Sequence, residues 1–428
     1  MLFDAGNPYR GALPDVLRLT WEDFDCGISP ANEAAMDREA EWTIVGYFAA
    51  DNDLAPLIFD NLLAMKSAGS NDAVNVCALF DGPLVTDAFF ARLNAGEPLA
   101  SDIVLRWSEL PTNDAKTLTF ALQLAATFPA KRRLVILGGH GRGWRGALLD
   151  QNAGAALIAA GRVAFPGTPA ECTARWQAAH RAVQHCTDAH FASGWAQAHT
   201  SPNKRFDILA FDACYMGNLE GLAAFAGEAD TLVVSEDLQP GEGYPYGDLI
   251  GRVKAQPEQT AGELAAYLVS ETKLYYGDPA RRRNVTQVAL RTQAIPTLVS
   301  SFLELARCLD VSNADALAAV QTALEHAWPF APTGSVDLIG FVMKLLAHPD
   351  SVVQAAAQAV LERWSSAMVA QAVRGGEDYP NGLAVYAALG GAVDASYVAL
   401  AQQIGLGAWA EFLKRYQRAS SQSAAGHA

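Results

Sequence analysis

Short apolar runs alternate with amphipathic segments along the first two thirds of the chain. The runs predict buried strands at 43–49, 74–80, 134–137, 206–211, 231–235 and 285–290. The segments between them, among them 57–65, 117–128, 219–225 and 261–268, carry apolar residues at helical spacing. Strands separated by helices predict a mostly parallel sheet that is covered on both faces. The pattern therefore predicts an α/β fold, a three-layer α/β/α sandwich, with residues 84–108 forming a β excursion or an edge.

The pattern changes beyond residue 292, where helical spacing dominates. Helices are expected at 296–309, 316–328, 336–346, 352–370 and 409–416, with a return to a strand at 382–386. The expected domains are an irregular N-terminal arm over 1–40, an α/β domain over 41–292 and a helical C-terminal region over 293–418. The α/β domain carries an insertion at about 151–203, and the small, polar tail 419–428 is expected to be disordered.

The charge balance bears on the class of partner. The chain has 31 Lys and Arg residues against 46 Asp and Glu residues, which gives a formal net charge of -15. Nucleic-acid binding needs a basic face that neutralises phosphates, so nucleic acid is not expected as a partner. An acidic surface instead attracts cationic peptides. Nothing in the pattern indicates an oligomeric state.

The amino terminus, the hydropathy and the cysteines bear on the compartment. No basic segment followed by an apolar run and a small-residue cleavage site is visible over 1–17, so no secretory signal is expected. No run reaches the roughly 18 consecutive apolar residues of a membrane span, and no membrane partner is expected. The six cysteines are scattered, which fits a reducing cytoplasm better than a disulfide framework. Cys77 and Cys308 lie in apolar patterns and are expected in the core.

Two chemically reactive residues stand just beyond predicted strands. His140 follows the run 134–137, and Cys214 follows the run 206–211. Ligand sites of open α/β sheets lie beyond the carboxyl ends of the strands, so both side chains are expected at the same edge. The thiolate is a nucleophile and the imidazole can take the thiol proton, which is the arrangement of a cysteine hydrolase. Cys214 is also expected to open a helix, whose dipole favours the thiolate. A core cysteine and a structural histidine are the alternatives.

Acidic residues near Cys214 bear on substrate choice. Asp212 lies two residues before Cys214, and alternation along an extended segment puts both side chains on the same side. A carboxylate at the floor of the pocket selects a cationic side chain, with Arg favoured by its two-pronged guanidinium. Glu242, or less favoured Glu236 or Asp237, could supply a second acid from the following loop. For these three, simple solvation of the loop is the alternative.

Five ordered segments of the sequence carry a resemblance to a known family. They are 42–54 (WTIVGYFAADNDL), 140–144 (HGRGW), 206–216 (FDILAFDACYM), 235–246 and 381–386 (NGLAVY). In these segments the chain resembles the clostripain-like cysteine peptidases, which share the caspase-like fold, and the likeness extends over 42–416. The resemblance implies that Cys214 is the nucleophile and that His140 is the base and acid. It also implies an oxyanion hole formed by the main-chain amides of Gly141 and Cys214, and cleavage after Arg or Lys.

The resemblance further implies two properties that the residues leave open. Members of the family are often cut between the catalytic residues, and candidate self-processing positions here are Arg162, Arg175, Arg181, Lys204 and Arg205. Calcium dependence is known in the family, and Asp51, Asp53 and Asp150 are candidate oxygen ligands. Asp51 and Asp53 are equally explained as helix caps, and no EF-hand spacing exists, so no cofactor is expected. No residue stands out as a third member that orients His140.

Other classes of function were weighed against the peptidase. The histidines at 180, 185, 190 and 199 do not stack on one helix face, so a solvated insertion is favoured over a metal site. Gly141 to Gly146 matches the dinucleotide pattern G-x-G-x-x-G, but Trp144 and Arg145 crowd the positions that must admit a pyrophosphate. A catalytically silent caspase-like module that binds a partner is the remaining alternative. The expected function is a cysteine endopeptidase that cuts after Arg or Lys in limited proteolysis of a cytoplasmic protein.

Overall fold

The computed structural model describes residues 29–83, 87–107, 110, 112–113, 115–148, 206–374, 380–389 and 391–426. The chain divides into two compact units. Unit 1 comprises the described residues within Met1–His140, Ala147–Asp212 and Gly241–Leu264. Unit 2 comprises those within Gly141–Gly146, Ala213–Pro240 and Ala265–Ala428. The domain boundaries expected from the sequence stay a prediction.

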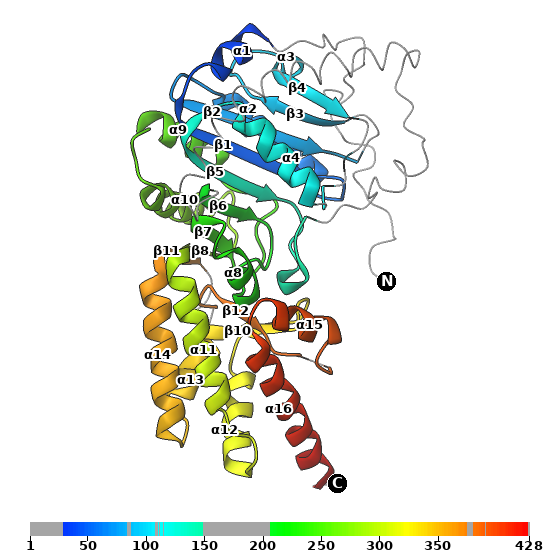
Figure 1. The fold of residues 1–428 in the computed structure, drawn as a ribbon, viewed down its shortest axis with the longest axis vertical. Helices are drawn as coiled ribbons and strands as arrows, with labels where there is room; N and C mark the ends of the chain where they lie inside the picture. The colour runs from blue at the N-terminus through cyan, green and yellow to red at the C-terminus, as the bar shows by residue number, and fades with distance from the viewer. Residues whose placement is uncertain are drawn as a thin grey trace. The chain divides into compact units, whose positions relative to one another are not determined.

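Unit 1 is built on parallel strands (Figure 1). Strand β1 (Ala40–Ala49) pairs in parallel with β2 (Val74–Asp81) on one side and with β5 (Ala130–Gly138) on the other. Strand β5 in turn pairs in parallel with β6 (Phe206–Asp212). Beyond β2, the antiparallel strands β3 (Ala88–Arg92) and β4 (Ile103–Trp107) form an edge, as expected for this stretch. The order within the unit is β6-β5-β1-β2-β3-β4.

Burial explains why these strands were visible in the sequence. From Trp42 to Ala49 every residue of β1 is buried, and all of β2 is buried. Helix α4 (Ala115–Ala126) packs on β1, while α2 (Ala55–Ala68) packs on β2 and on α9 (Tyr246–Ala255). A parallel strand covered in this way has no solvent face, so it reads as a continuous apolar run.

Unit 2 combines antiparallel strands with helices. Strand β7 (Ala229–Ser235) pairs with β8 (Val285–Arg291), and β8 pairs with β11 (Met368–Arg374), both antiparallel. A three-stranded sheet holds β9 (Pro329–Phe330), β10 (Ser335–Asp337) and β12 (Ala384–Tyr386). The helices are α8 (Leu219–Phe225), α10 (Ala261–Tyr275, from Ala265 onward), α11 (Ile295–Cys308), α12 (Ala314–Glu325), α13 (Leu338–Leu345), α14 (Ser351–Ala367), α15 (Ala395–Gln403) and α16 (Gly407–Gly426).

The C-terminal helices pack around buried aromatic residues. Helices α11 and α14 run side by side, and α13 packs on α14 (Figure 1). Trp409 of α16 is fully buried, with its ring 4.9 Å from that of Phe302 and 5.0 Å from that of Phe412 between ring centres. Its indole Nε1 donates to the carbonyl oxygen of Tyr386 at 2.7 Å, which satisfies the one polar group of the side chain.

The predicted α/β class with a mostly parallel sheet and a helical C-terminal region is confirmed, with several local corrections. Strand β8 is antiparallel, and the helix predicted to 370 ends at Ala367 because β11 leaves it to pair with β8. Helices α9 and α15 were not predicted. Within the arm expected to be irregular, helix α1 (Pro30–Met36) has a Ser29 cap and a proline in its first turn. The tail expected to be disordered is helical as far as Gly426. No helix in the described part of the chain is long and apolar enough to cross a membrane.

Candidate active site

His140 follows the end of β5 in unit 1. The main chain around it is fixed, since Gly139 N–H donates to Asp212 O at 3.2 Å and Leu148 N–H donates to His140 O at 2.8 Å. The imidazole side chain is 26% exposed, and its Nε2 lies 2.6 Å from Oδ1 of Asp53. Asp53 comes from the loop after β1, whose Phe48 pairs with Gly138 of β5. Two neighbouring parallel strands therefore deliver the carboxylate and the imidazole to the same edge.

Asp53 is the residue that sequence reasoning missed. It was assigned a role as a helix cap or a calcium ligand, and no partner was expected for His140. The available signal was topological: parallel strands next to each other in a sheet end at the same edge, so polar residues just after β1 belong with those just after β5. That inference needs the strand order, which the apolar pattern does not give.

Asp212 ends β6 in unit 1, opposite Gly138 of β5. Its side chain is largely buried, and one oxygen, Oδ2, accepts hydrogen bonds from Tyr244 N–H at 3.2 Å and from Tyr246 Oη at 2.7 Å. Gly243 has a φ of 70°, and a Cβ placed on it would lie 2.5 Å from the same Oδ2. The loop therefore approaches the carboxylate so closely that only glycine fits at this position.

Glu242 precedes that glycine, in the same loop of unit 1, and is half-buried. Its role as a second substrate acid stays a prediction. Asp237, one of the two less favoured acids, is also half-buried, and its main chain bonds to Thr286 and to Tyr215.

Cys214 lies in a turn of unit 2 and is half-buried. Helix α8 begins only at Leu219, and its cap is Asn218, whose side chain accepts from Gly221 N–H at 2.8 Å. The expectation that Cys214 opens a helix is therefore wrong, because the helix begins at Leu219. The Asn218 cap was the better signal for the start of the helix.

The turn after Cys214 is strained and tied down. Tyr215 has a φ of 62°, in the left-handed region that residues with a side chain rarely adopt. Its N–H donates to the carbonyl oxygen of Asp237 at 3.1 Å, and Asn218 Nδ2 donates to its carbonyl oxygen at 2.8 Å. These bonds at both ends hold the left-handed turn that presents Cys214.

Gly141 lies directly against Cys214 within unit 2. A Cβ placed on Gly141 would stand 1.9 Å from the carbonyl oxygen of Cys214 and 2.8 Å from its nitrogen. No side chain larger than hydrogen fits there unless the backbone moves. The two residues whose amides were expected to form the oxyanion hole are therefore brought together.

The glycine-rich segment is anchored by Trp144. Its Nε1 donates to Thr333 O at 2.9 Å, and its ring packs edge-on against those of Tyr386 and Tyr397, with both ring centres 5.2 Å away. Glu220, which is buried, accepts from Tyr386 N–H at 3.0 Å and from Tyr397 Oη at 2.9 Å, and burial raises the pKa of its carboxyl. The HGRGW and NGLAVY segments of the sequence thus meet in one aromatic cluster.

This anchoring removes the dinucleotide alternative. Residues Gly143–Arg145 form a short 3-10 helix, and Arg142 N–H closes the segment by donating to Gly146 O at 2.8 Å. Trp144 points into the aromatic cluster. A G-x-G-x-x-G fingerprint needs an open loop that starts an α-helix, so this segment cannot cradle a pyrophosphate in that way.

The comparisons with known proteins agree with this geometry. The model of the Clostripain family, Peptidase C11, matches residues 196–369, a segment that contains Cys214 and its turn. This segment of the chain is similar to the clostripain family of cysteine peptidases. No curated protein sequence matches the chain.

Three solved structures of clostripain-family proteases share the fold. A secreted C11 cysteine protease from Bacteroides thetaiotaomicron, in complex with an irreversible peptide inhibitor, has a TM-score of 0.56 at 16% identity over 87% of this chain and 99% of its own. A second structure from that organism, named iotapain, gives 0.58 at 14% over 88% and 99%. An inactive zymogen C11 protease from Parabacteroides distasonis gives 0.54 at 18% over 88% and 98%. At such identities these likenesses bear on the fold alone.

Glu236, the first acid after β7, is not placed to meet a substrate of this peptidase. It is fully buried in unit 2, where its Oε2 accepts from Gly382 N–H. Burial first, and then the charge of Asp337, raise the pKa of Glu236 well above its usual value. Asn381 Nδ2 donates to Asp337 Oδ2 at 2.6 Å. The assignment of Glu236 as a substrate-binding acid is therefore wrong. Glu236 and Asp337 form a buried carboxyl pair that bonds to the NGLAVY segment.

No metal-binding group of three or more His, Cys, Asp or Glu side chains exists among the residues that the structure describes. Of the three candidate calcium ligands, Asp51 is buried, Asp53 contacts His140, and Asp150 lies outside the described residues. The insertion histidines and the five basic residues proposed for self-processing also lie outside them.

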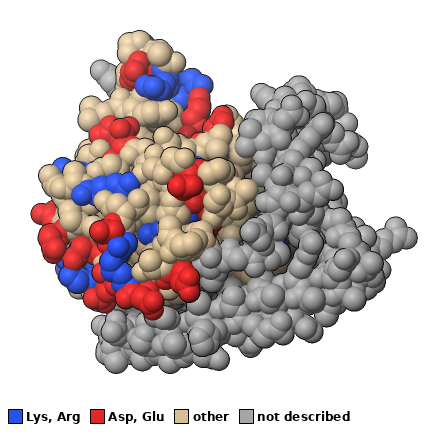
Figure 2. Space-filling view, turned by 90° about the horizontal axis from the view of Figure 1, so that it is seen from above, with Lys and Arg blue, Asp and Glu red and all other residues tan. Residues whose placement is uncertain are grey.

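Two surface features bear on the class of ligand. On the described part of the face in Figure 2, acidic and basic side chains are interspersed, without a continuous basic stripe of the kind that binds nucleic acid.

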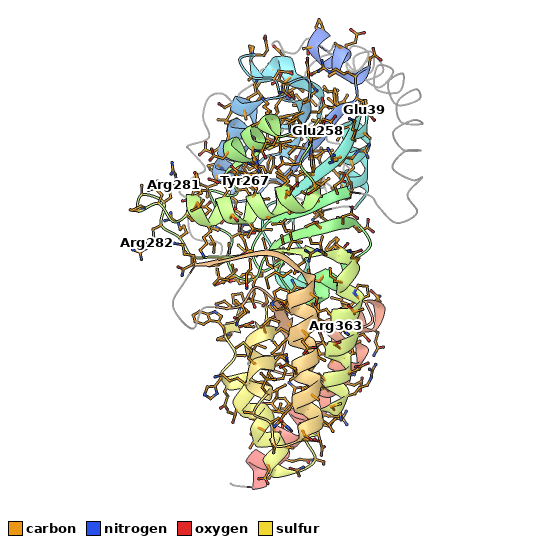
Figure 3. All side chains as sticks on the ribbon, turned by 90° about the vertical axis from the view of Figure 1, so that its left-hand side faces the viewer. Glu39, Glu258, Tyr267, Arg281, Arg282 and Arg363 are labelled. Carbon is orange, nitrogen blue, oxygen red and sulfur yellow. The ribbon has the colours of Figure 1, made fainter. Side chains whose placement is uncertain are left out.

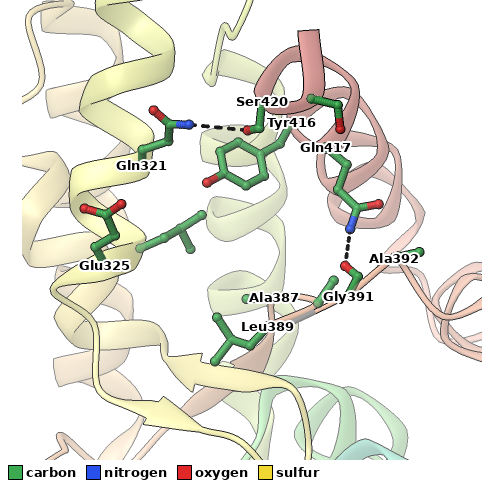
Figure 4. A pocket seen from close by; sticks show the side chains of 12 residues that line it. Gln321, Glu325, Ala387, Leu389, Gly391, Ala392, Tyr416, Gln417 and Ser420 are labelled. Carbon is green, nitrogen blue, oxygen red and sulfur yellow. Dashed lines mark hydrogen bonds between the residues drawn. The ribbon is translucent and has the colours of Figure 1, made fainter. Parts of the chain in front are cut away.

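Unit 2 also has an open pocket of about 550 Å³ bordered by Glu325 of α12, Leu389 and Tyr416 of α16 (Figure 4). None of the candidate catalytic or substrate-binding residues lines it.

The buried carboxyl pair predicts how stability depends on pH. Because Glu236 binds its proton more tightly when folded, stability is greatest below its unfolded pKa of 4.5 and falls as the pH rises toward the folded pKa. The slope is at most about 1.4 kcal/mol per pH unit for one proton. Glu236→Gln keeps an acceptor for Gly382 N–H without a charge, so it should flatten the fall and raise stability at neutral pH. Urea unfolding between about pH 5 and pH 8 measures this.

The matched control is Glu258→Gln, which neutralises an exposed carboxylate (Figure 3). It should leave the pH dependence of unfolding as it is in the wild type. A Glu236→Gln protein with the slope of the wild type would show that this carboxyl is already ionised in the folded state.

Proposed function

We propose that this chain is a clostripain-like peptidase that cleaves peptide bonds after Arg or Lys, with Cys214 as the nucleophile and His140 as the base and acid. The observation that carries the pairing is the fit of Gly141 against the Cys214 backbone in unit 2. His140 is bonded directly to Gly141. In unit 1, the strand that leads to His140 is paired with the strand that leads to Cys214, through Gly138 and Asp212. Chain continuity at both places supports the same pair.

The chemistry follows from these groups. The imidazole takes the proton of the thiol, and the thiolate attacks the carbonyl carbon of the substrate. The negative charge that develops on the carbonyl oxygen is met by the N–H groups of Gly141 and Cys214, which cost no reorganisation because the backbone is already in place. The imidazolium then gives its proton to the leaving amine. Water hydrolyses the acyl-enzyme by the reverse sequence of proton transfers.

Asp53 completes the proposal by orienting the imidazole. A carboxylate accepts hydrogen bonds only, so the Nε2 that faces Asp53 carries a proton and Nδ1 is the nitrogen that exchanges a proton with sulfur. The carboxylate also stabilises the imidazolium that forms during the reaction.

Specificity is assigned to Asp212. Its carboxylate is held by Tyr244 and Tyr246 at the end of β6, two residues before Cys214. A buried, anchored carboxylate close in the chain to the nucleophile favours a cationic side chain before the cut, and Arg above Lys. Glu242, from the same loop as the two tyrosines, is proposed as a second acid.

Hydrolysis of fluorogenic peptides tests the function directly. Peptides with Arg or Lys before the reporter should be cleaved, matched peptides with Gln or Leu there should not, and Cys214→Ala should abolish cleavage. Mass spectrometry of the same incubations reports self-cleavage, which Cys214→Ala should also prevent. The expected positions of such a cut are Arg162, Arg175, Arg181, Lys204 and Arg205, between His140 and Cys214. A folded wild-type protein that cleaves none of these peptides would favour the silent, partner-binding alternative.

Limited proteolysis of one specific intracellular protein is the proposed role of this activity. The Cys214→Ala variant should then retain a single defined protein from a cell lysate. Retention of many unrelated proteins, or of none, would point to broad digestion.

Asp212→Asn separates recognition from reactivity. The amide keeps an acceptor for Tyr246 but removes the charge, so kcat/KM for an Arg peptide should fall by roughly 100-fold or more. Alkylation of Cys214 by iodoacetamide, which needs no cationic group, should change by less than about twofold, since the nucleophile is intact. An equal loss in both measurements would remove Asp212 from the substrate pocket.

Asp53→Asn tests the orientation of the imidazole. The substitution removes the charge that stabilises the imidazolium, so kcat should fall by roughly 10- to 1000-fold with little change in KM. The matched control is Asp60→Asn on α2, an exposed carboxylate of the same unit. If both variants keep the kcat of the wild type, Asp53 does not orient the imidazole in catalysis.

A further inference from the structure

One residue of unit 2, Gln239, contacts the sulfur of Cys214 through both its main-chain N–H and its main-chain carbonyl oxygen. The N–H of Gln239 points at Sγ with a nitrogen–sulfur distance of 3.4 Å, and Sγ lies 3.7 Å from the carbonyl oxygen of the same residue. A thiol can donate to that oxygen, whereas a thiolate can only accept from the N–H. The hydrogen bond from nitrogen therefore strengthens when the proton leaves, because its acceptor becomes charged.

The side chain of Gln239 fixes the backbone of this residue to β8. Gln287 Nε2 donates to Gln239 Oε1, and both side chains are buried. Gln287 stands in the middle of a hydrogen-bonded ladder, opposite Ser235 of β7 on one side and Ala372 of β11 on the other. Its backbone is therefore as rigid as the sheet in which it lies, and the amide of its side chain is a fixed anchor.

Neighbouring bonds hold the rest of the segment in register. Thr286 Oγ1, next to Gln287 on β8, accepts from Asp237 N–H at 2.9 Å. The carbonyl oxygen of Asp237 in turn accepts from Tyr215 N–H, in the turn that presents Cys214. The segment 236–240 and the nucleophile turn are thus tied to each other and to β8.

The ionisable neighbours make such a donor useful. Asp237 and Tyr215 both interact electrostatically in this region, and burial together with the charges of Asp237 and Cys214 raises the pKa of Tyr215 to about 12. The phenol is therefore neutral at physiological pH, while the carboxylate of Asp237 opposes a second negative charge nearby. Since no helix begins at Cys214, the Gln239 amide takes the place of the dipole that the sequence had suggested.

We propose that Gln287 and Gln239 act as a positioning pair, in which Gln287 holds the Gln239 peptide so that its N–H stabilises the Cys214 thiolate. The inference rests on the proposed function, since it assumes that Cys214 is the nucleophile. Neither glutamine touches substrate in this scheme, and both act through the sulfur.

The test follows alkylation of Cys214 by iodoacetamide as a function of pH. The peptide that contains Cys214 is quantified by mass spectrometry, so the other cysteines do not interfere. Gln287→Met removes the donor with little change in volume, and the midpoint of the alkylation profile should move upward by about one pH unit. The rate on the high-pH plateau, where all of the thiol is ionised, should stay within about twofold of the wild type.

A double-mutant cycle checks that the two residues act as a unit. Gln239→Met should produce a similar shift, and the double variant should shift no further than either single one. Gln259→Met, which removes a buried glutamine whose partner is Arg252, is the matched control and should leave the midpoint unchanged. Each variant is first shown to be folded by its cooperative urea transition.

The outcomes separate the inference from the proposed function. An unchanged midpoint in folded Gln287→Met and Gln239→Met would overturn the inference, and so would a change confined to the plateau rate, which would mean that the pair only controls access to sulfur. Alkylation does not require turnover. A shifted midpoint in a protein that cleaves no peptide would therefore leave the positioning pair intact and remove the peptidase assignment instead.

Discussion

The backbones of Gly141 and Cys214 lie so close that neither the glycine-rich segment nor the nucleophile turn can move without the other. The space between them excludes even a methyl group. An oxyanion hole made of amides has to be formed before substrate arrives, because its contribution depends on donors that need no reorganisation. Close packing of two backbones is one way to obtain that rigidity, and glycine is the residue that allows it.

Much of unit 2 can be understood as support for that contact. Trp144 anchors the glycine-rich segment in an aromatic cluster with Tyr386 and Tyr397, and the buried Glu220 satisfies polar groups of both tyrosines. The strand that carries Tyr386 also reaches the nucleophile turn, where Ala384 N–H donates to Gly217 O at 2.8 Å. Segments far apart in the sequence therefore share one structural task, and the segment 381–386 takes part in it without contributing a reactive group of its own.

The sequence predicted the fold class and the parallel strands β1, β2, β5 and β6, because buried parallel strands leave a continuous apolar pattern. It placed His140 and Cys214 just beyond strand ends for the same reason. The sequence could not predict that Asp53 contacts His140, because this contact depends on β1 and β5 being neighbours in the sheet. The pattern of apolar residues does not determine the order of the strands. The helix expected at Cys214 was a different kind of error: the apolar spacing correctly indicates a helix at 219–225, and the Asn218 cap marks its start beyond Cys214.

Strand β11 and the acid Glu236 show where prediction from the sequence fails because tertiary contacts decide the structure. The residues after Ala367 have helical spacing as far as 370, but the free edge of β8 offers backbone hydrogen bonds that a helix end cannot match. Glu236 looked like a loop acid because it follows a strand, yet the buried Asp337 and Gly382 N–H determine its environment. The partner strand of β11 is β8, which lies far earlier in the sequence, and the partners of Glu236, Asp337 and Gly382, lie far later. No local sequence pattern can reveal partners at such separations.

The segment from Glu236 to Tyr246 has a consequence for redesign. It reaches sulfur through Gln239 and the carboxylate of Asp212 through Tyr244, so one short stretch of chain contacts both the proposed specificity residue and the proposed nucleophile. Transplanting the whole stretch from a relative with another preference would exchange two properties at once. A graft that begins after Pro240 would leave the sulfur's amide donor in place and alter recognition alone.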